Sequence, residues 1–284
     1  VDDKEGRILP PASFATYAEA QDSFKTHFKP ASAKRKAPEA LQIQGTRFVP
    51  HGHHVIHGFV SASRLNAAAK GVGVTITAYL TAILIMAVHR STLSLNTENR
   101  PIVIAMPVNL RKQFPSSSLR NFFAVIPIGV AMNDHLTFEQ IAETVQRQLT
   151  EKTAKPYLSE VIAGSLKYEN RLFSRLAPLK LKDLAIRYGF DHYGEEAKTL
   201  TLTNLGKVDV PSAMASHIEA METTMYPTAK SPINCAVSSI NDRLTVTFAR
   251  NIVESDVIMH FFRQLVRLSG LDVAVAGNDW GMGA

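Results

Sequence analysis

The alternation of hydrophobic and polar residues along the chain predicts interleaved strands and helices. A period of two over residues 53–59 predicts a strand. Ser61 or Ser63 then favours the start of a helix that ends at Gly71. Residues 74–90 are apolar on nearly all sides, which requires burial and predicts the central helix of the core.

The middle of the chain repeats this order. Residues 101–108 are β-branched and apolar and predict a strand. Residues 121–132 predict a second strand, at a sheet edge or with a bulge, because Pro127 cannot donate to a central ladder. Thr137 and Gln140 form a capping box at the start of an amphipathic helix.

The last third predicts further strands and helices. It contains a helical region over residues 159–188 interrupted near Pro178, strands at 199–205 and 218–226, a hairpin of residues 233–240 and 244–250 turning at Asn241 and Asp242, and a final helix capped by Ser255. Such an order indicates an α/β fold with a mixed β-sheet flanked by helices.

Residues 1–45 differ from the rest in composition. They combine four prolines with charged runs and only a short helical pattern around residues 17–28, which predicts a linker with one short helix. We therefore expect one globular lobe over residues 46–284. The chain begins at Val1 in a polar segment without methionine, which indicates a piece of a longer protein.

Charge and cysteine content narrow the class of protein. The formal net charge is +6, but part of the excess lies in one stretch between Lys25 and Lys36, and no nucleic-acid motif accompanies it, so we expect no nucleic-acid partner. An anionic small ligand remains compatible. Cys235 is the only cysteine, which excludes an internal disulfide and makes a cytoplasmic location the default. The uncharged run over residues 72–88 favours a buried helix rather than a membrane span.

Familiar catalytic motifs are absent. The histidines between residues 51 and 57 have no additional ligands nearby in the sequence, so ordinary strand and loop histidines are favoured over a metal site. The sequence has no G-x-S-x-G nucleophile elbow and no phosphate-binding glycine motif. Polar side chains do follow or precede apolar strands, namely Asn109, Arg111, Asn121 and Asn204. From the residues alone, these are either hydrogen bonders that fix loops or walls of a reaction channel.

Three segments decide between these alternatives. PVNLRKQFPSSSLRNFF (107–123), TLTNLGKVDVP (201–211) and SPINCAVSSINDRLTVTFAR (231–250) resemble the C-terminal half of the alcohol acetyltransferase-like proteins. HHVIHGF, GVTITAYLTA and FFRQLV match in the same order, so the resemblance covers the chain from about residue 10. That family belongs with chloramphenicol acetyltransferase and the peptide synthetase condensation domains, whose fold has two similar lobes with the active site in a tunnel between them. This chain resembles the second lobe.

The resemblance implies where the chemistry lies. In the superfamily, the general base is a histidine of an HHxxxDG motif in the first lobe, and no H-x-x-x-D-G occurs in this sequence. We therefore expect no catalytic residue in this chain. Arg111 matches an arginine that pairs with the motif aspartate and holds the catalytic loop in shape.

Other residues are expected to form the tunnel wall. The pair Asn121 and Phe122 resembles an asparagine-phenylalanine element beside the channel, and Asn204 with Gly206 resembles the strand-end turn near the acyl-acceptor site. Asn109, which follows an apolar strand, is expected to line the same tunnel.

These features lead to one main hypothesis and one alternative. The resemblance implies transfer of an acyl group from acyl-CoA or a carrier thioester to the hydroxyl or amine of a small molecule, by this lobe joined to an N-terminal lobe of the same protein. Acyl-CoA is the expected co-substrate, and no tightly bound cofactor is expected. On its own, the chain should be inactive. The alternative is a non-catalytic binding or structural domain that retains a degenerate acyltransferase fold.

Overall fold

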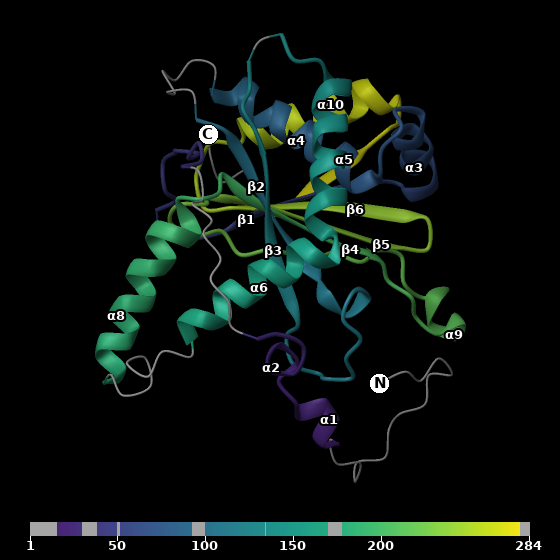
Figure 1. Cartoon of the computed structure of the whole chain (residues 1–284). Coiled ribbons are helices and arrows are strands. Elements are labelled where there is room, and N and C mark those ends of the chain that lie inside the picture. Colours follow the sequence, from purple (N-terminus) through teal and green to yellow (C-terminus); the bar gives the residue numbers. More distant parts are fainter. Residues whose placement is uncertain are drawn as a thin grey trace.

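The structure, a computed structural model, describes residues 16–29, 39–49, 52–92, 100–133, 135–169 and 178–278. The strands are β1 (His54–Ser61), β2 (Ile102–Asn109), β3 (Phe123–Val130), β4 (Leu200–Lys207), β5 (Ile233–Ile240), β6 (Arg243–Arg250) and β7 (Ala274–Gly277) (Figure 1). The longer helices are α3 (Ala62–Gly71), α4 (Ile76–Thr92), α5 (Phe138–Thr153), α6 (Lys155–Glu169), α8 (Leu179–Gly189) and α10 (Asp256–Ser269). The short ones are α1 (Tyr17–Ala20), α2 (Ser23–His27), η1 (Leu110–Lys112), η2 (Phe190–Glu195) and α9 (Ser212–Ala215).

The described strands form one mixed sheet in the order β3-β2-β4-β5-β6-β1-β7. β4 runs parallel to both β2 and β5, and the other pairs are antiparallel. This confirms the predicted α/β fold with a mixed sheet flanked by helices. β3 lies at an edge, as Pro127 predicts, because an edge strand can leave one backbone position without a donor.

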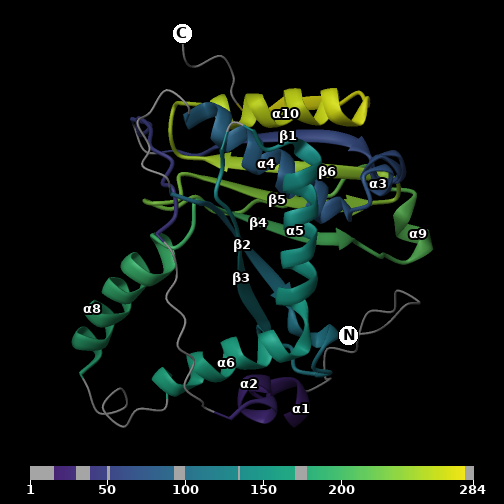
Figure 2. The ribbon, with the colours of Figure 1, turned by 45° about the horizontal axis from the view of Figure 1, so that its top comes forward.

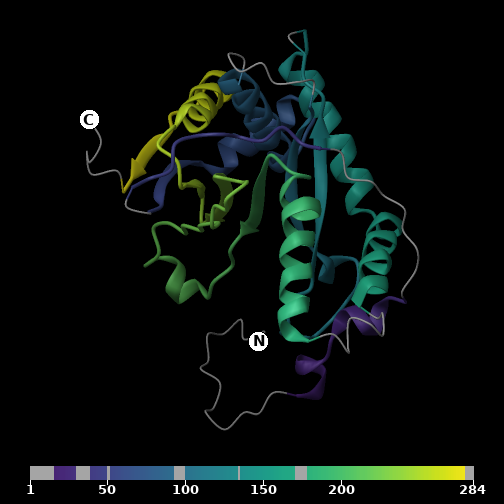
Figure 3. The ribbon, with the colours of Figure 1, turned by 90° about the vertical axis from the view of Figure 1, so that its left-hand side faces the viewer.

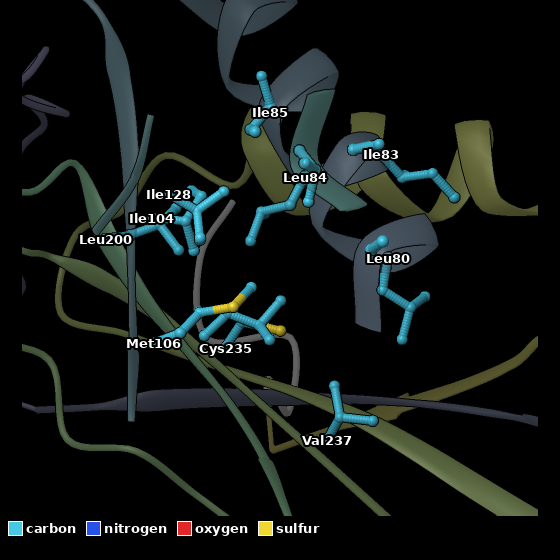
Figure 4. Close-up of a cluster of buried hydrophobic side chains, with 14 of the residues drawn as sticks. Leu80, Ile83, Leu84, Ile85, Ile104, Met106, Ile128, Leu200, Cys235 and Val237 are labelled. Atoms are coloured by element: carbon cyan, nitrogen blue, oxygen red, sulfur yellow. The ribbon is translucent and has the colours of Figure 1, made fainter. Parts of the chain in front are cut away.

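Helix α4 is the centre of the core. Eleven of its residues are buried, and α5 and α10 pack beside it. Figure 4 shows Leu80 and Leu84 of α4 lying over strand side chains that include Ile104 and Cys235. Burial raises the pKa of the Cys235 thiol, so this cysteine is an inert core residue.

On the other face of the sheet, a largely irregular segment, residues 208–232, lies over β5 (Figure 3). The strand predicted over residues 218–226 is wrong. Alternate side chains of this segment are half-buried and exposed, as in a strand. Its carbonyls, however, are bonded by side chains of the sheet: Ser238 Oγ donates to Met221 O at 2.7 Å and Asn234 Nδ2 to Tyr226 O at 2.8 Å. An extended segment that lies flat on a sheet therefore shows the same period of two as a paired strand.

Most local predictions are confirmed. Ser61 caps α3, the Thr137 and Gln140 box starts α5, and Asn241 with φ of 51° turns the β5–β6 hairpin. The last helix is confirmed, and Ser255 is its N-cap residue as predicted, but the Ser255 side chain makes no capping hydrogen bond. Strand β7 and helix α9 were not predicted, since four residues carry too little periodicity.

Parts of the predicted linker pack onto the lobe. Phe28, Leu41 and Ile43 are buried members of the core cluster. The predicted short helix is divided into α1 and α2, which have separate caps at Thr16 and Asp22. Residues 1–15 and 30–38, with their prolines, lie outside the described residues.

Close packing beneath α10 gives a stability prediction. A Cβ at Gly58 would overlap the ring of Phe262, which is itself held 5.4 Å from Phe261 and 5.8 Å from Phe248 between ring centroids. Gly58→Ala is therefore expected to lower the free energy of unfolding by about 1–3 kcal/mol in urea titrations. Gly71→Ala is the matched control, because no atom lies within 4 Å of its added Cβ. An equal loss in both variants would contradict this packing account.

The turn after β5 gives a pH prediction. Asp242 accepts hydrogen bonds from Ser61 Oγ at 2.6 Å and Ser63 N at 2.8 Å, which tie the turn to the start of α3 and hold the pKa of Asp242 below its usual 3.8. A lowered native pKa stabilises the fold above the unfolded pKa, and this stabilisation is lost as pH falls through the native value. Urea titrations should show Asp242→Asn less stable than wild type at neutral pH, with a difference that shrinks below pH 3.8. A constant difference would refute this.

Candidate functional site

A cavity of about 520 Å³ lies at the carboxyl ends of the parallel strands β2 and β4. It is bounded by residues 106–109 of β2, residues 202 and 204–206 of β4, the start of α4, and one side of α5. Carboxyl ends of parallel strands are where open α/β sheets place ligand sites, because the loops there diverge. The cavity is in the size range of small-molecule sites.

The start of α4 forms one end of the cavity. Thr75 Oγ1 accepts from Ala78 N at 3.2 Å, so Thr75 caps the helix. The Thr75 backbone N and Oγ1 both donate to Gln146 Oε1 at 2.9 Å. Gln146 therefore fixes α4 against α5, and the hydroxyls of Thr75 and Thr77 lie in the cavity wall.

The end of β4 contains a bulge that shapes the wall. The register between β4 and β5 shifts between Asn204 and Gly206, and Gly206 has φ of 75°. Asn204 Oδ1 accepts from Gly206 N at 2.8 Å, while its Nδ2 donates to Thr77 Oγ1 at 2.9 Å. The amide thus joins the bulge to α4. The sequence segment TNLG lies inside β4, so the expected strand-end turn is instead a bulge within the strand, which glycine permits at positive φ.

Asn109 and Arg111 shape the loop after β2. Asn109 Oδ1 accepts from Arg111 N at 3.0 Å and caps η1, and Asn109 also lines the cavity. Arg111 Nη2 donates to Ser118 O at 2.6 Å and Arg120 O at 2.7 Å, which closes the loop over residues 112–120. Within this lobe, Arg111 therefore stabilises the loop between β2 and β3.

Asn121 and Phe122 do not line the cavity. Asn121 is exposed, and Phe122 is only 2% exposed. The Phe122 ring packs edge-on against Phe24 at 5.0 Å and lies 5.8 Å from the ring of His27. The structure thus places Phe122 under α2, a site that sequence reasoning could not foresee because the contact joins residues almost 100 positions apart.

The segment containing α1 and α2 also holds the β2–β3 loop. Ser118 Oγ donates to Gln21 O at 2.6 Å, Leu119 N donates to Glu19 O at 2.8 Å, and the hydroxyls of Ser23 and Ser116 are 2.6 Å apart. The loop that Arg111 closes from one side is therefore held by the N-terminal segment from the other (Figure 2). The one sequence signal for this packing is the i, i+4 spacing of the apolar residues Phe24 and Phe28.

The described side chains that line the cavity can bind a ligand but include no general base. Its described lining has hydroxyl and amide groups from Thr77, Asn109, Asn204 and others, apolar patches from β2 and β4, and Lys112 as the one ionisable side chain. A lysine side chain carries positive charge and only donates hydrogen bonds, so Lys112 attracts anions. The wall can orient a polar, flexible ligand but supplies no general base of its own.

The described histidines lie away from this cavity. His53, His54 and His57 are on or beside β1, which β5 and β6 separate from β4. His57 Nδ1 lies 2.9 Å from Thr247 Oγ1, and its Nε2 lies 3.5 Å from Glu222. Across the described ranges, no three potential ligand side chains come together as a metal site. His51 lies outside these ranges.

No single helix in the described part of the chain is long and apolar enough to cross a membrane. α3 and α4 pass such a test only together, as a pair bent by 78°, and α4 is buried in the core.

Comparison with known proteins identifies the fold. No family profile and no curated protein sequence matches the chain. A solved structure of the nonribosomal peptide synthetase FmoA3 matches 82% of the chain at 14% identity and a TM-score of 0.54. The epimerization domain from the third module of tyrocidine synthetase B matches 87% at 12% identity and a TM-score of 0.51. The chain spans 23% of the first protein and 53% of the second. Its fold is thus one lobe of the chloramphenicol acetyltransferase-like fold.

Proposed function

We propose that this chain is the second lobe of an acyltransferase that moves an acyl group from acyl-CoA or a carrier thioester to a hydroxyl or amine. The observation that carries the proposal is the cavity at the ends of β2 and β4, where Asn109, Asn204 and Gly206 meet. These are three of the five residues expected to form the tunnel wall. The fold, which is that of one lobe of two-lobed acyl-transferring proteins, supports the same reading.

The lining suits the arm of a thioester donor. Such an arm alternates amide groups with short alkyl segments, and the cavity alternates amide and hydroxyl side chains with apolar patches from Met106 and Leu202. Lys112 at the start of the loop is placed to attract the phosphates of CoA. The alkyl segments gain from burial and the amides from hydrogen bonds.

The reaction divides between two lobes. A base of the first lobe removes the proton of the acceptor hydroxyl or amine, and the acceptor oxygen or nitrogen attacks the thioester carbonyl. The carbon–sulfur bond then breaks, and the thiol leaves with a proton. We propose that Asn204, which the resemblance places near the acyl-acceptor site, also lines the donor arm close to where the acceptor attacks. Arg111 keeps the neighbouring loop in shape. We infer that the chain alone catalyses none of these steps.

The test compares this chain with the joined protein, meaning this chain preceded by a first lobe in one polypeptide. With acetyl-CoA, a small alcohol and a thiol indicator, the joined protein should release CoA and the isolated chain should not. A joined protein with alanine in place of the first lobe's base serves as the control and should also be inactive. Release by the isolated chain would refute the division of labour. A joined protein that binds acetyl-CoA without transfer would favour the non-catalytic alternative.

A further inference from the structure

Helix α8 presents large apolar side chains to solvent along its whole length. The exposed fractions are 81% for Leu179, 59% for Leu181, 66% for Leu184, 67% for Ile186, 61% for Tyr188 and 52% for Phe190 just after the helix. Helical spacing sorts them into two rows on opposite sides: Leu181, Leu184 and Tyr188 in the first, and Leu179, Ile186 and Phe190 in the second. Both sides of α8 therefore carry unburied apolar surface.

α8 also stands apart from the lobe. It projects from the body in Figures 1 and 2, and its only substantial contact with a described element is with η2, which continues from it. The helix has 11 residues, and isolated helices shorter than about 12–15 residues are marginal in water. Burial of its apolar rows against another body would supply the missing stabilisation.

The two rows restrict what that body can be. A membrane surface buries one side of an interfacial helix and leaves the other in water, so it would cover only one row of α8. A protein surface that encloses the helix can cover both. The chain spans 53% of the epimerization domain, so a large part of that domain lies outside the match. The proposed first lobe would be the counterpart of this unmatched part.

We propose that α8 is a docking helix and that the first lobe of the proposed acyltransferase buries both of its apolar rows. This assignment rests on the proposed function for the identity of the partner. It adds a contact distant from the cavity, made by a helix that no catalytic role requires. Apolar anchors of this kind carry most of the binding energy of an interface when they are fully desolvated.

Amide hydrogen exchange tests the docking directly. The α8 amides are expected to exchange at least about tenfold more slowly in the joined protein than in the isolated chain, because docking removes local opening. The amides of α5 serve as the internal reference, since α5 already packs on β3 and α4 in the lobe. Equal exchange of α8 in the two proteins would overturn the proposal.

Paired substitutions identify the surface. Leu184→Glu in the joined protein should abolish most of the α8 protection, whereas Lys180→Glu, on the charged edge of the same helix, should retain it. Leu184 is 66% exposed in the lobe, so the unfolding midpoint of the isolated chain should be the same for both variants. This second measurement excludes a general folding defect. Protection that survives Leu184→Glu would overturn the proposal.

Two further results would contradict the choice of partner. One is binding of the isolated chain to vesicles of phosphatidylcholine and phosphatidylserine that is lost in Leu184→Glu. The other is a dimer of the isolated chain in sedimentation that is lost in the same variant. Docking of α8 and acyl transfer can be tested separately. An α8 that is protected in a joined protein without acyl transfer refutes only the function, and acyl transfer with an unprotected α8 refutes only the docking.

Discussion

Arg111→Ala is expected to lower kcat/KM of the joined protein about 100-fold, because a displacement of a site wall by about 1 Å can cost that much. The guanidinium joins the carbonyls of Ser118 and Arg120 and so closes the loop that follows Asn109. Without it, both carbonyls lose a charge-assisted bond, and the loop loses the side of its support that faces the cavity wall. Steady-state release of CoA measures the effect.

The neighbouring Arg120 provides a matched control. Arg120 contributes its backbone carbonyl to the contact with Arg111, so Arg120→Ala keeps that carbonyl and should retain activity within about threefold. Arg111→Lys should restore part of the activity, because an ammonium also donates to carbonyls but lacks the planar guanidinium. If Arg111→Ala retained full turnover, neither the contact of Arg111 with the loop nor an ion pair with the first lobe would contribute to the reaction.

Asn204→Ala is expected to lower kcat/KM of the joined protein by roughly tenfold to a hundredfold. The Asn204 amide joins Gly206 N to Thr77 Oγ1 across the cavity, so its loss frees the bulge and the start of α4 at once. Each bond contributes about 1 kcal/mol to stability, and most of the effect should therefore appear as misplacement rather than unfolding. Steady-state kinetics combined with thermal unfolding separates the two.

Thr203→Ala is the control for Asn204. Successive side chains of a strand point to opposite faces, and Thr203 does not line the cavity. This variant should retain kcat/KM within about threefold. An equal loss of activity in both variants would mean that β4 tolerates no change at all, and the assignment of Asn204 to the wall would fail.

Elements that depend on local sequence were predictable. Residues within a few positions of one another determine the capping box of α5, the apolar residues on nearly all sides of α4 and the turn at Asn241. The segment over residues 218–226 was not predictable, because its period of two arises from a sheet surface formed by β5. Whether an extended segment pairs or lies flat is decided by tertiary contacts.

The candidate site was predictable only in part. Asn109 and Asn204 could be found because polar residues at the ends of apolar strands require partners. The role of Gln146 could not, since its bond to Thr75 depends on how α5 crosses α4. Phe122 was placed on the tunnel wall by resemblance, yet it packs beneath α2 through a contact that no local pattern records.

The cavity at the ends of β2 and β4 is proposed to be one wall of a thioester-binding cleft. A crystal structure of the joined protein with a non-hydrolysable acetyl-CoA analogue tests it most directly. The donor arm is expected to lie against Asn109 and Asn204, with its thioester facing a base of the first lobe. An arm bound elsewhere, with the cavity filled by side chains of the first lobe, would contradict it.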